Sequence, residues 1–132
     1  MILEMSRIPG SILVVDDDAS IRSALRELLE TEGYKVIEAS NGLAALGRLR
    51  DGFRPCAIVL DLMMPVMDGW DFRSDQLRDP ELRDIPVVVM TAAGFSQSTM
   101  RTQFGQIELV SKPLSPRDLL IALRRSSHDV RD

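Results

Sequence analysis

Several features are scarce in this chain of 132 residues, and each scarcity excludes a class of protein. Cysteine occurs once, at Cys56, so no intrachain disulfide can form and a reducing compartment is expected. No apolar stretch reaches the length of a membrane span, and the opening MILEMSRIPG lacks the basic segment and apolar core of a signal peptide. We therefore expect a cytoplasmic protein without a membrane partner.

Basic residues are also in the minority. The net charge is -4, and no basic stretch is interleaved with aromatic residues, which make up only 5% of the chain. This balance argues against nucleic acid as a direct partner, because phosphate recognition needs a basic surface. The one histidine, His128, lies in a polar segment near the end of the sequence. We expect it to be solvated rather than to carry a phosphoryl group.

What the sequence does contain is a regular alternation of short apolar runs and helical patterns. Apolar runs predict strands at residues 11–15, 34–38, 56–60, 86–90 and 107–110. Helical spacing predicts helices at 21–29, 43–49 and 70–77, a short one within 94–106, and a last one that begins at Pro116 after Ser115 as its cap. Residues 11–125 are therefore expected to form a single domain, with 1–10 as a loose lead-in and 126–132 as a polar C-terminal tail.

Strands that alternate with helices indicate an α/β fold, a doubly wound five-stranded parallel sheet with helices on both faces. The first, third and fourth runs are apolar throughout, as strands covered on both faces should be. In the strand order 2-1-3-4-5, the first and third strands are neighbours. Ligands of such sheets bind beyond the carboxyl ends of the strands, where the strand order reverses. The residues that follow each strand are therefore the candidates for function.

Polar residues follow four of the strands at this edge. They are Asp16, Asp17 and Asp18 after the first strand, Asp61 after the third, Thr91 after the fourth, and Ser111 and Lys112 after the fifth. Asp18 is expected to cap the helix that follows. The other carboxylates would converge, and two of them about 4 Å apart repel by roughly 4 kcal/mol at an effective dielectric of 20. Such a cluster needs a cation, and its oxygen ligands suit a hard ion such as Mg²⁺.

Four stretches at the expected strand ends, VVDDD, IVLDLMMPVMDG, VVVMTA and VSKP, resemble in order and spacing the receiver domain of two-component response regulators. The resemblance covers roughly residues 11–125 and implies the flavodoxin-like receiver fold. It also implies a function as the phosphoacceptor domain of a two-component or phosphorelay system. The implied partners are a histidine kinase or a histidine phosphotransfer protein as donor, and an output protein or domain bound through the face between Phe95 and Leu123.

The same resemblance assigns a role to each residue at the strand ends. It makes Asp61 the phosphoacceptor, Thr91 the hydroxyl that bonds a phosphoryl oxygen, and Lys112 the ammonium that pairs with that group. The implied ligands of Mg²⁺, or of Mn²⁺ as an alternative ion, are Asp16, Asp17, Asp61 and the backbone carbonyl of Met63. In the family the peptide bond between Lys112 and Pro113 is cis, a geometry that X-Pro bonds reach at modest cost.

The sequence departs from the family pattern at two places. Leu109 occupies the position three before the lysine, which is usually aromatic and reports phosphorylation by changing its rotamer. A leucine can repack, but it presents neither a ring nor a hydroxyl to a partner. The stretch 94–106 is rich in Ser, Thr, Gln and Gly, which are weaker helix formers than Ala or Leu. We expect a short, mobile helix there.

Two other functions compete with a phosphorylation switch. Phosphatases of the haloacid dehalogenase type also use a strand-end Asp with Mg²⁺, but they carry a second Asp two residues later as general acid, where this chain has Met63. A degenerate receiver that acts as a phosphorylation-independent binding module would lack an acidic residue, the Thr or the Lys, and all are present. We therefore expect a signalling switch and not an enzyme. The sequence leaves open whether the chain is a stand-alone receiver or is cut from a longer regulator.

Overall fold

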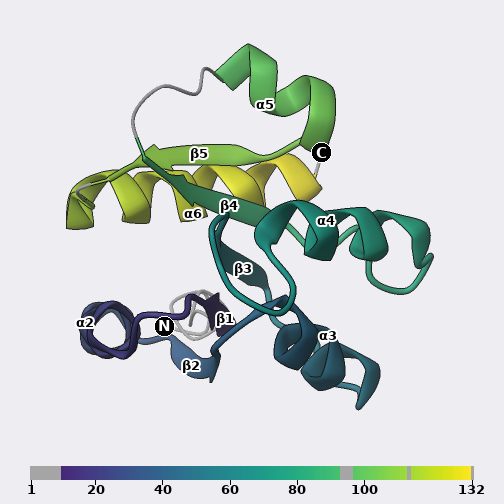
Figure 1. Cartoon of the computed structure of the whole chain (residues 1–132). Coiled ribbons are helices and arrows are strands. Elements are labelled where there is room, and N and C mark those ends of the chain that lie inside the picture. The colour runs from purple at the N-terminus through teal and green to yellow at the C-terminus, as the bar shows by residue number, and fades with distance from the viewer. Residues whose placement is uncertain (1–9, 93–96, 113, 132) are drawn as a thin grey trace.

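The computed structural model describes residues 10–92, 97–112 and 114–131, which form a central sheet flanked by helices (Figure 1). The strands are β1 (Ser11–Val15), β2 (Lys35–Ala39), β3 (Ala57–Asp61), β4 (Val87–Thr91) and β5 (Glu108–Ser111). All neighbouring pairs are parallel, and the strand order is β2-β1-β3-β4-β5. The predicted doubly wound sheet with the order 2-1-3-4-5 is confirmed.

Different helices cover the two faces of this sheet. The helices are α2 (Ala19–Thr31), α3 (Gly42–Arg50), α4 (Gly69–Arg78), α5 (Gln97–Phe104) and α6 (Pro116–Arg131). α3, α4 and α5 pack on one face, where Leu46, Phe72 and Phe104 are at most 1% exposed (Figure 1). α2 and α6 pack on the other, where Leu29 and Leu119 are fully buried. Among the described residues, no helix combines the length and the hydrophobicity needed to cross a bilayer.

The elements differ from the expected ranges mainly at their ends. β3 and β4 run one residue further than predicted and include Asp61 and Thr91 themselves. α5 is short, as expected, with 8 residues. The prediction that the last helix stops before a polar tail at 126 is wrong, because α6 continues to Arg131. Ser126 is buried, and its hydroxyl donates to the Leu123 carbonyl at 2.8 Å, so this polar residue is satisfied within the helix. Of the expected lead-in at 1–10, residues 1–9 lie outside the described residues, so this prediction stays open.

Parallel pairing brings the carboxyl ends of the strands to one edge of the sheet. Val15 pairs with Leu60, so the residue after β1 lies beside the last residue of β3. Thr91 pairs with Ser111, so β4 and β5 end together as well. The candidate residues after β1, in β3, in β4 and after β5 therefore face a common space beyond the sheet.

A buried arginine ties α4 to the end of α5. Arg73 is 4% exposed, and it donates from Nε to the Phe104 carbonyl at 2.9 Å, from Nη2 to the Gln106 carbonyl at 3.3 Å and from Nη1 to Gln76 Oε1 at 2.8 Å. Gln76 is fully buried and donates to two carbonyls of the segment before β4, at 2.9 and 3.1 Å. Burial lowers the pKa of Arg73 to about 10, so its guanidinium remains charged at neutral pH.

Candidate functional site

Three carboxylates meet at the carboxyl edge of the sheet. Asp16 and Asp17 follow β1, Asp61 ends β3, and one carboxylate oxygen from each lies within 4.8 Å of the others. Asp16 is 1% exposed and Asp61 5%, whereas Asp17 is exposed to solvent. The structure therefore brings together the acidic side chains that the sequence analysis singled out, and it leaves one side of the cluster open.

The side chains of the loop between β1 and α2 hold its conformation. The Asp18 amide donates to Asp16 Oδ1 at 2.9 Å. The Asp18 carboxylate accepts hydrogen bonds from the amides of Ser20 at 2.8 Å and Ile21 at 3.3 Å, which makes Asp18 the N-cap of α2. The predicted cap is confirmed, and it accounts for the third aspartate of the run without a role in the cluster.

Asp16 is the most constrained member of the cluster. Burial raises the pKa of its carboxyl group, and the hydrogen bond from the Asp18 amide opposes that shift. The negative charge of Asp61 raises this pKa further, whereas the positive charge of Lys112 lowers it. The Oδ2 atom of Asp16 is buried and has no hydrogen-bond partner among the described residues. A buried acceptor without a partner costs about 1–3 kcal/mol, so a bound cation would stabilise this oxygen.

Lys112 and Thr91 complete the site from the other side of β3. Lys112 Nζ lies 3.2 Å from Asp61 Oδ1 and 3.9 Å from Asp16 Oδ2. Its amide donates to the Thr91 carbonyl at 2.8 Å, which fixes its main chain beside the end of β4. Thr91 is 3% exposed, and its hydroxyl donates to the Ala92 carbonyl at 3.2 Å. Both residues line the same cleft of about 310 Å³ as the three carboxylates.

A tight loop joins β3 to α4 beside Asp61. A Cβ atom on Gly69 would lie 2.6 Å from the Asp61 carbonyl oxygen, so only glycine fits at this approach. Asp68 caps α4 by accepting a hydrogen bond from an amide of its first turn at 2.9 Å. The Met63 amide lies 3.5 Å from Asp61 Oδ1, while the Met63 side chain is 75% exposed. The loop therefore holds main-chain groups of Met63 near the acidic cluster.

Val66, within this loop, adopts a strained backbone conformation. Its φ of 69° lies in the left-handed region, which is unusual for a β-branched residue, and its side chain is 76% exposed. Val66→Gly should relieve roughly 1–2 kcal/mol of strain in the folded state. Glycine also gives the unfolded chain more conformational freedom, which lowers the stability by roughly 0.5–1 kcal/mol. We expect a net stabilisation of about 1 kcal/mol, measured as a higher midpoint of urea unfolding with an unchanged slope. Val66→Thr keeps the branched Cβ and should show no gain. A glycine variant less stable than wild type would contradict the assignment of strain.

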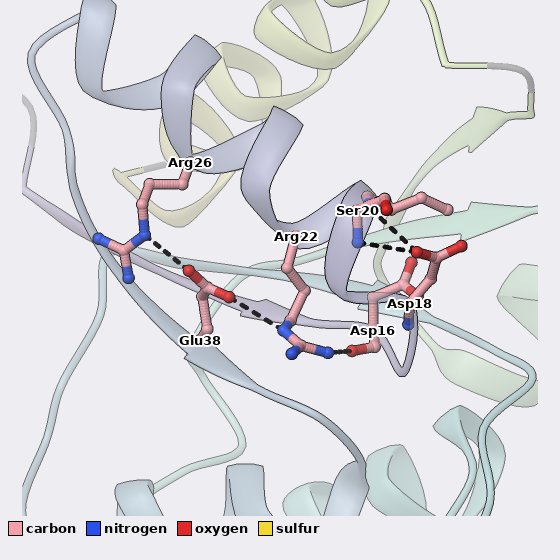
Figure 2. A network of polar contacts seen from close by, with 7 residues as sticks. Asp16, Asp18, Ser20, Arg22, Arg26 and Glu38 are labelled. Carbon is pink, nitrogen blue, oxygen red and sulfur yellow. Dashed lines mark hydrogen bonds and ion pairs between the residues drawn. The ribbon is translucent and has the colours of Figure 1, made fainter.

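A polar network behind the acidic loop was not identified from the sequence (Figure 2). Arg22 donates from Nη1 to the Asp16 carbonyl at 2.7 Å and from Nε to Glu38 Oε1 at 2.9 Å. Arg26 donates from Nε to Glu38 Oε2 at 2.6 Å. The hydrogen bond from Arg26 lowers the pKa of Glu38 most, and that from Arg22 adds to it. The only sequence signal is the spacing of the two arginines, four residues apart on one helix face, which an ordinary solvated face shares.

The remaining predicted positions fall into two groups. Phe95 and Pro113, and with Pro113 the predicted cis bond, lie outside the described residues. Leu109 is half-buried in β5 and packs against the core beneath α3, α4 and α5. Leu123 is 1% exposed and belongs to the core on the other face. A partner that binds this side of the molecule would therefore contact residues of α5 and α6 other than Leu123. The predicted mobility of α5 stays a prediction.

The chain is similar in sequence and fold to known proteins. Residues 12–124 match the response regulator receiver domain family. The chain is similar to the probable transcriptional regulator ycf27 of Porphyra purpurea, with 40% identity over 114 residues, which are 86% of this chain and 45% of that protein. It is 35% identical over 114 residues to the phosphate regulon transcriptional regulatory protein PhoB of Escherichia coli, covering 86% and 49%. The solved signal receiver domain of a signal transduction histidine kinase from Syntrophus aciditrophicus is 29% identical, with a TM-score of 0.80 and 92% of each chain covered. The chain spans about half the length of these two regulators, ycf27 and PhoB.

Proposed function

The chain belongs to the response regulator receiver domain family, and from this membership we propose that it is a phosphorylation-controlled switch whose phosphoacceptor is Asp61. The setting of the Asp61 carboxylate carries the proposal. It ends β3 at the edge of an open cleft, and its Oδ1 lies 3.2 Å from Lys112 Nζ. Asp16 and Asp17 provide the acidic surroundings in which a metal ion would join the reaction.

The donor set fits a magnesium ion. Three carboxylates supply oxygen ligands, and the buried Oδ2 of Asp16 has no hydrogen-bond partner among the residues that the structure describes. Hard divalent cations prefer such oxygen donors. We assign Mg²⁺, or Mn²⁺ as the alternative ion, to the carboxylates of Asp16, Asp17 and Asp61 and to the backbone carbonyl of Met63. When bound, the ion neutralises negative charge on the carboxylate and phosphoryl oxygens.

Asp61 is the nucleophile in this proposal. One of its carboxylate oxygens bonds to the phosphorus of a phosphohistidine, the P–N bond breaks, and the departing imidazole takes up a proton. The product is an acyl phosphate on Asp61. The phosphohistidine would belong to a histidine kinase or to a histidine phosphotransfer protein. The open side of the acidic cluster at Asp17 leaves an approach for such a donor.

Lys112 and Thr91 stabilise the transferred group. Lys112 Nζ, which pairs with Asp61 in the absence of phosphate, would pair with a phosphoryl oxygen after transfer. The Thr91 hydroxyl donates to the Ala92 carbonyl in the unphosphorylated chain, and rotation of its hydrogen and side chain would redirect it to the phosphoryl group. That change would alter the end of β4 and is our proposed route from the phosphate to the output surface.

The proposed output surface is formed by α5, β5 and α6, the side of the molecule predicted between Phe95 and Leu123. An output protein or domain would bind it with an affinity that depends on phosphorylation. Leu109 lies in β5 on the side of α5, where a change at Thr91 can repack it. Because the chain spans about half the length of ycf27 and PhoB, any output resembling theirs is part of the proposal.

The proposed switch is not a phosphatase of small esters. A phosphatase with the same nucleophile needs a general acid beside the leaving group. The position two residues after Asp61 holds Met63, and its thioether has no proton to donate. We therefore expect the chain to influence only its own phosphorylation and dephosphorylation.

Incubation of the full chain with acetyl phosphate and Mg²⁺ should add one phosphoryl group per molecule, because Asp61 displaces acetate from phosphorus. Intact-mass spectrometry measures the adduct, and peptide mapping should locate it at Asp61. The adduct should be lost in hydroxylamine, as an acyl phosphate is, and should not form when EDTA removes the ion. Labelling that is equally fast in EDTA would show that phosphorylation needs no metal ion and would contradict that part of the proposal. Repeated turnover of p-nitrophenyl phosphate would favour the phosphatase.

A further inference from the structure

We propose that Arg22 is a positioning residue for the Mg²⁺ site, and that its guanidinium, oriented by Glu38, fixes the main chain from which the acidic loop presents its carboxylates. The inference deepens the proposed function and rests on it. Among the described residues, no ion pair joins Arg22 to a carboxylate of the acidic cluster. Its contact with the loop is the hydrogen bond of 2.7 Å from Nη1 to the carbonyl oxygen of Asp16. Arg22 therefore acts on the site through the backbone.

The main chain of Asp16 is held from two sides. Its amide donates to the Ala39 carbonyl at the end of β2 at 3.1 Å, and its carbonyl accepts from Arg22. The Asp18 amide holds Oδ1 of the same residue at 2.9 Å. Within the described part of the chain, three of the four polar groups of Asp16 have a hydrogen-bond partner. The fourth is Oδ2, which lies 3.9 Å from Lys112 Nζ. These constraints leave Asp16 little freedom except to present Oδ2 to the cluster.

The contact requires the forked head group of an arginine. Nε of Arg22 binds Glu38 Oε1 at 2.9 Å while Nη1 binds the carbonyl, so two acceptors are held in one plane (Figure 2). A lysine has one ammonium on a flexible stem and lacks this planar fork. The side chains of Arg22 and Glu38 are 18% and 27% exposed, which makes their pairing less screened than that of a surface ion pair.

Glu38 is itself held in place. It lies in β2, paired in register with Val14 of β1, and its second oxygen accepts from Arg26 Nε at 2.6 Å. An unpaired guanidinium so close to three carboxylates would pair with them and compete with a metal ion. By binding Nε, Glu38 keeps the guanidinium of Arg22 directed at the carbonyl. Two arginines and one glutamate thus connect α2 and β2 to the loop that carries the metal ligands (Figure 2).

The test is a titration of Mg²⁺ into the full chain by isothermal titration calorimetry. Arg22→Met keeps most of the aliphatic stem and loses the fork. We expect it to raise the Kd for Mg²⁺ about tenfold, as does the loss of other groups that hold a metal-binding residue in place. Arg22→Lys keeps the charge and should show a smaller increase. Asp17→Asn should abolish saturable binding and so locates the binding event at the cluster. Glu38→Gln should also weaken binding, because it releases the guanidinium.

Arg54→Met is the matched control. Arg54 also donates to a main-chain carbonyl, that of Leu49 at 2.6 Å, and to a glutamate, Glu81 at 3.2 Å. It lies between α3 and β3, just before the start of β3, whereas the acidic cluster lies at the other end of that strand. Its loss should leave the Kd within about twofold of wild type. In thermal unfolding measured without Mg²⁺, Arg22→Met and Arg54→Met can each have a lower melting temperature than wild type. Only Arg22→Met should also lose part of the rise in melting temperature that Mg²⁺ produces.

The outcomes separate this inference from the proposed function. If wild type binds no Mg²⁺, or Asp17→Asn binds as wild type does, the metal site fails and the positioning role fails with it. If wild type binds, Asp17→Asn does not, and both Arg22 variants keep the wild-type Kd, the positioning role alone is overturned. Should Arg22→Met fail to fold, Arg22→Lys decides, and a wild-type Kd in that variant overturns the inference.

Discussion

Asp61→Asn should form no acyl phosphate with acetyl phosphate and Mg²⁺, a loss of at least about 100-fold in the labelling rate. An amide oxygen is a far weaker nucleophile than a carboxylate, and it cannot form the same anhydride with phosphorus. The neighbouring carboxylates cannot take over its role. Asp16 is 1% exposed with Oδ1 already bonded to the Asp18 amide, and Asp17 is on the exposed side of the cluster, without the lysine contact of 3.2 Å.

Asp68→Asn is the matched control for this prediction. It makes the same chemical change in the same loop, and asparagine caps a helix about as well as aspartate. It should be labelled at the wild-type rate. Intact-mass spectrometry over a time course measures both variants in one buffer. One full phosphoryl group on Asp61→Asn, formed at the rate of the control, would show that the phosphoacceptor is another residue.

The convergence of the acidic residues was predictable because it follows from chain direction and pairing alone. Parallel strands end at one edge, and a strand order that places β1 beside β3 puts the residue after Val15 next to Asp61. The cap at Asp18 was predictable for a similar reason, since a short polar side chain before an apolar helical pattern bonds its own first turn. Both features depend on local residue types and on the order of the strands.

Side-chain contacts with main-chain atoms could not be predicted in this way, because no pattern of residue types marks them in the sequence. Arg22 binds the carbonyl of Asp16, and every residue has a carbonyl, so nothing in the sequence marks which one is bound. Val66 carries no signal of its φ of 69°, because the loop imposes that angle. α6 extends beyond Ser126 although the polar composition of this stretch favoured a tail, and the Ser126 hydroxyl is satisfied inside the helix by the Leu123 carbonyl. Tertiary geometry decides these features.

Arg73 is another such case, because an arginine on a helix is normally a sign of a solvated face. Arg73→Met should destabilise the chain by about 3 kcal/mol, which corresponds to a fall in melting temperature of roughly 10 °C. The substitution leaves the Phe104 carbonyl and Gln76 Oε1 buried without their donor, at about 1–3 kcal/mol each. The Gln106 carbonyl is only partly buried, so water can replace the guanidinium there. No carboxylate of the described residues pairs with the buried Arg73 charge, so its burial costs free energy. Removing that charge recovers part of the lost stability, and the expected net loss is therefore smaller than the summed cost of the two broken hydrogen bonds.

Urea unfolding of Arg73→Met and Arg78→Met compares the same substitution at a buried and an exposed position of α4. The Arg78 side chain is 76% exposed and pairs with Asp75 at 3.3 Å, so its variant should stay within about 0.5 kcal/mol of wild type. The double variant of Arg73→Met with Gln76→Met should lose less than the sum of the two single losses, because each single variant leaves the other side chain with a broken contact. Equal stability of Arg73→Met and Arg78→Met would contradict this prediction. It would mean that the cost of burying the Arg73 guanidinium equals the gain from its three hydrogen bonds. The link between α4 and the end of α5 would then contribute no net stability.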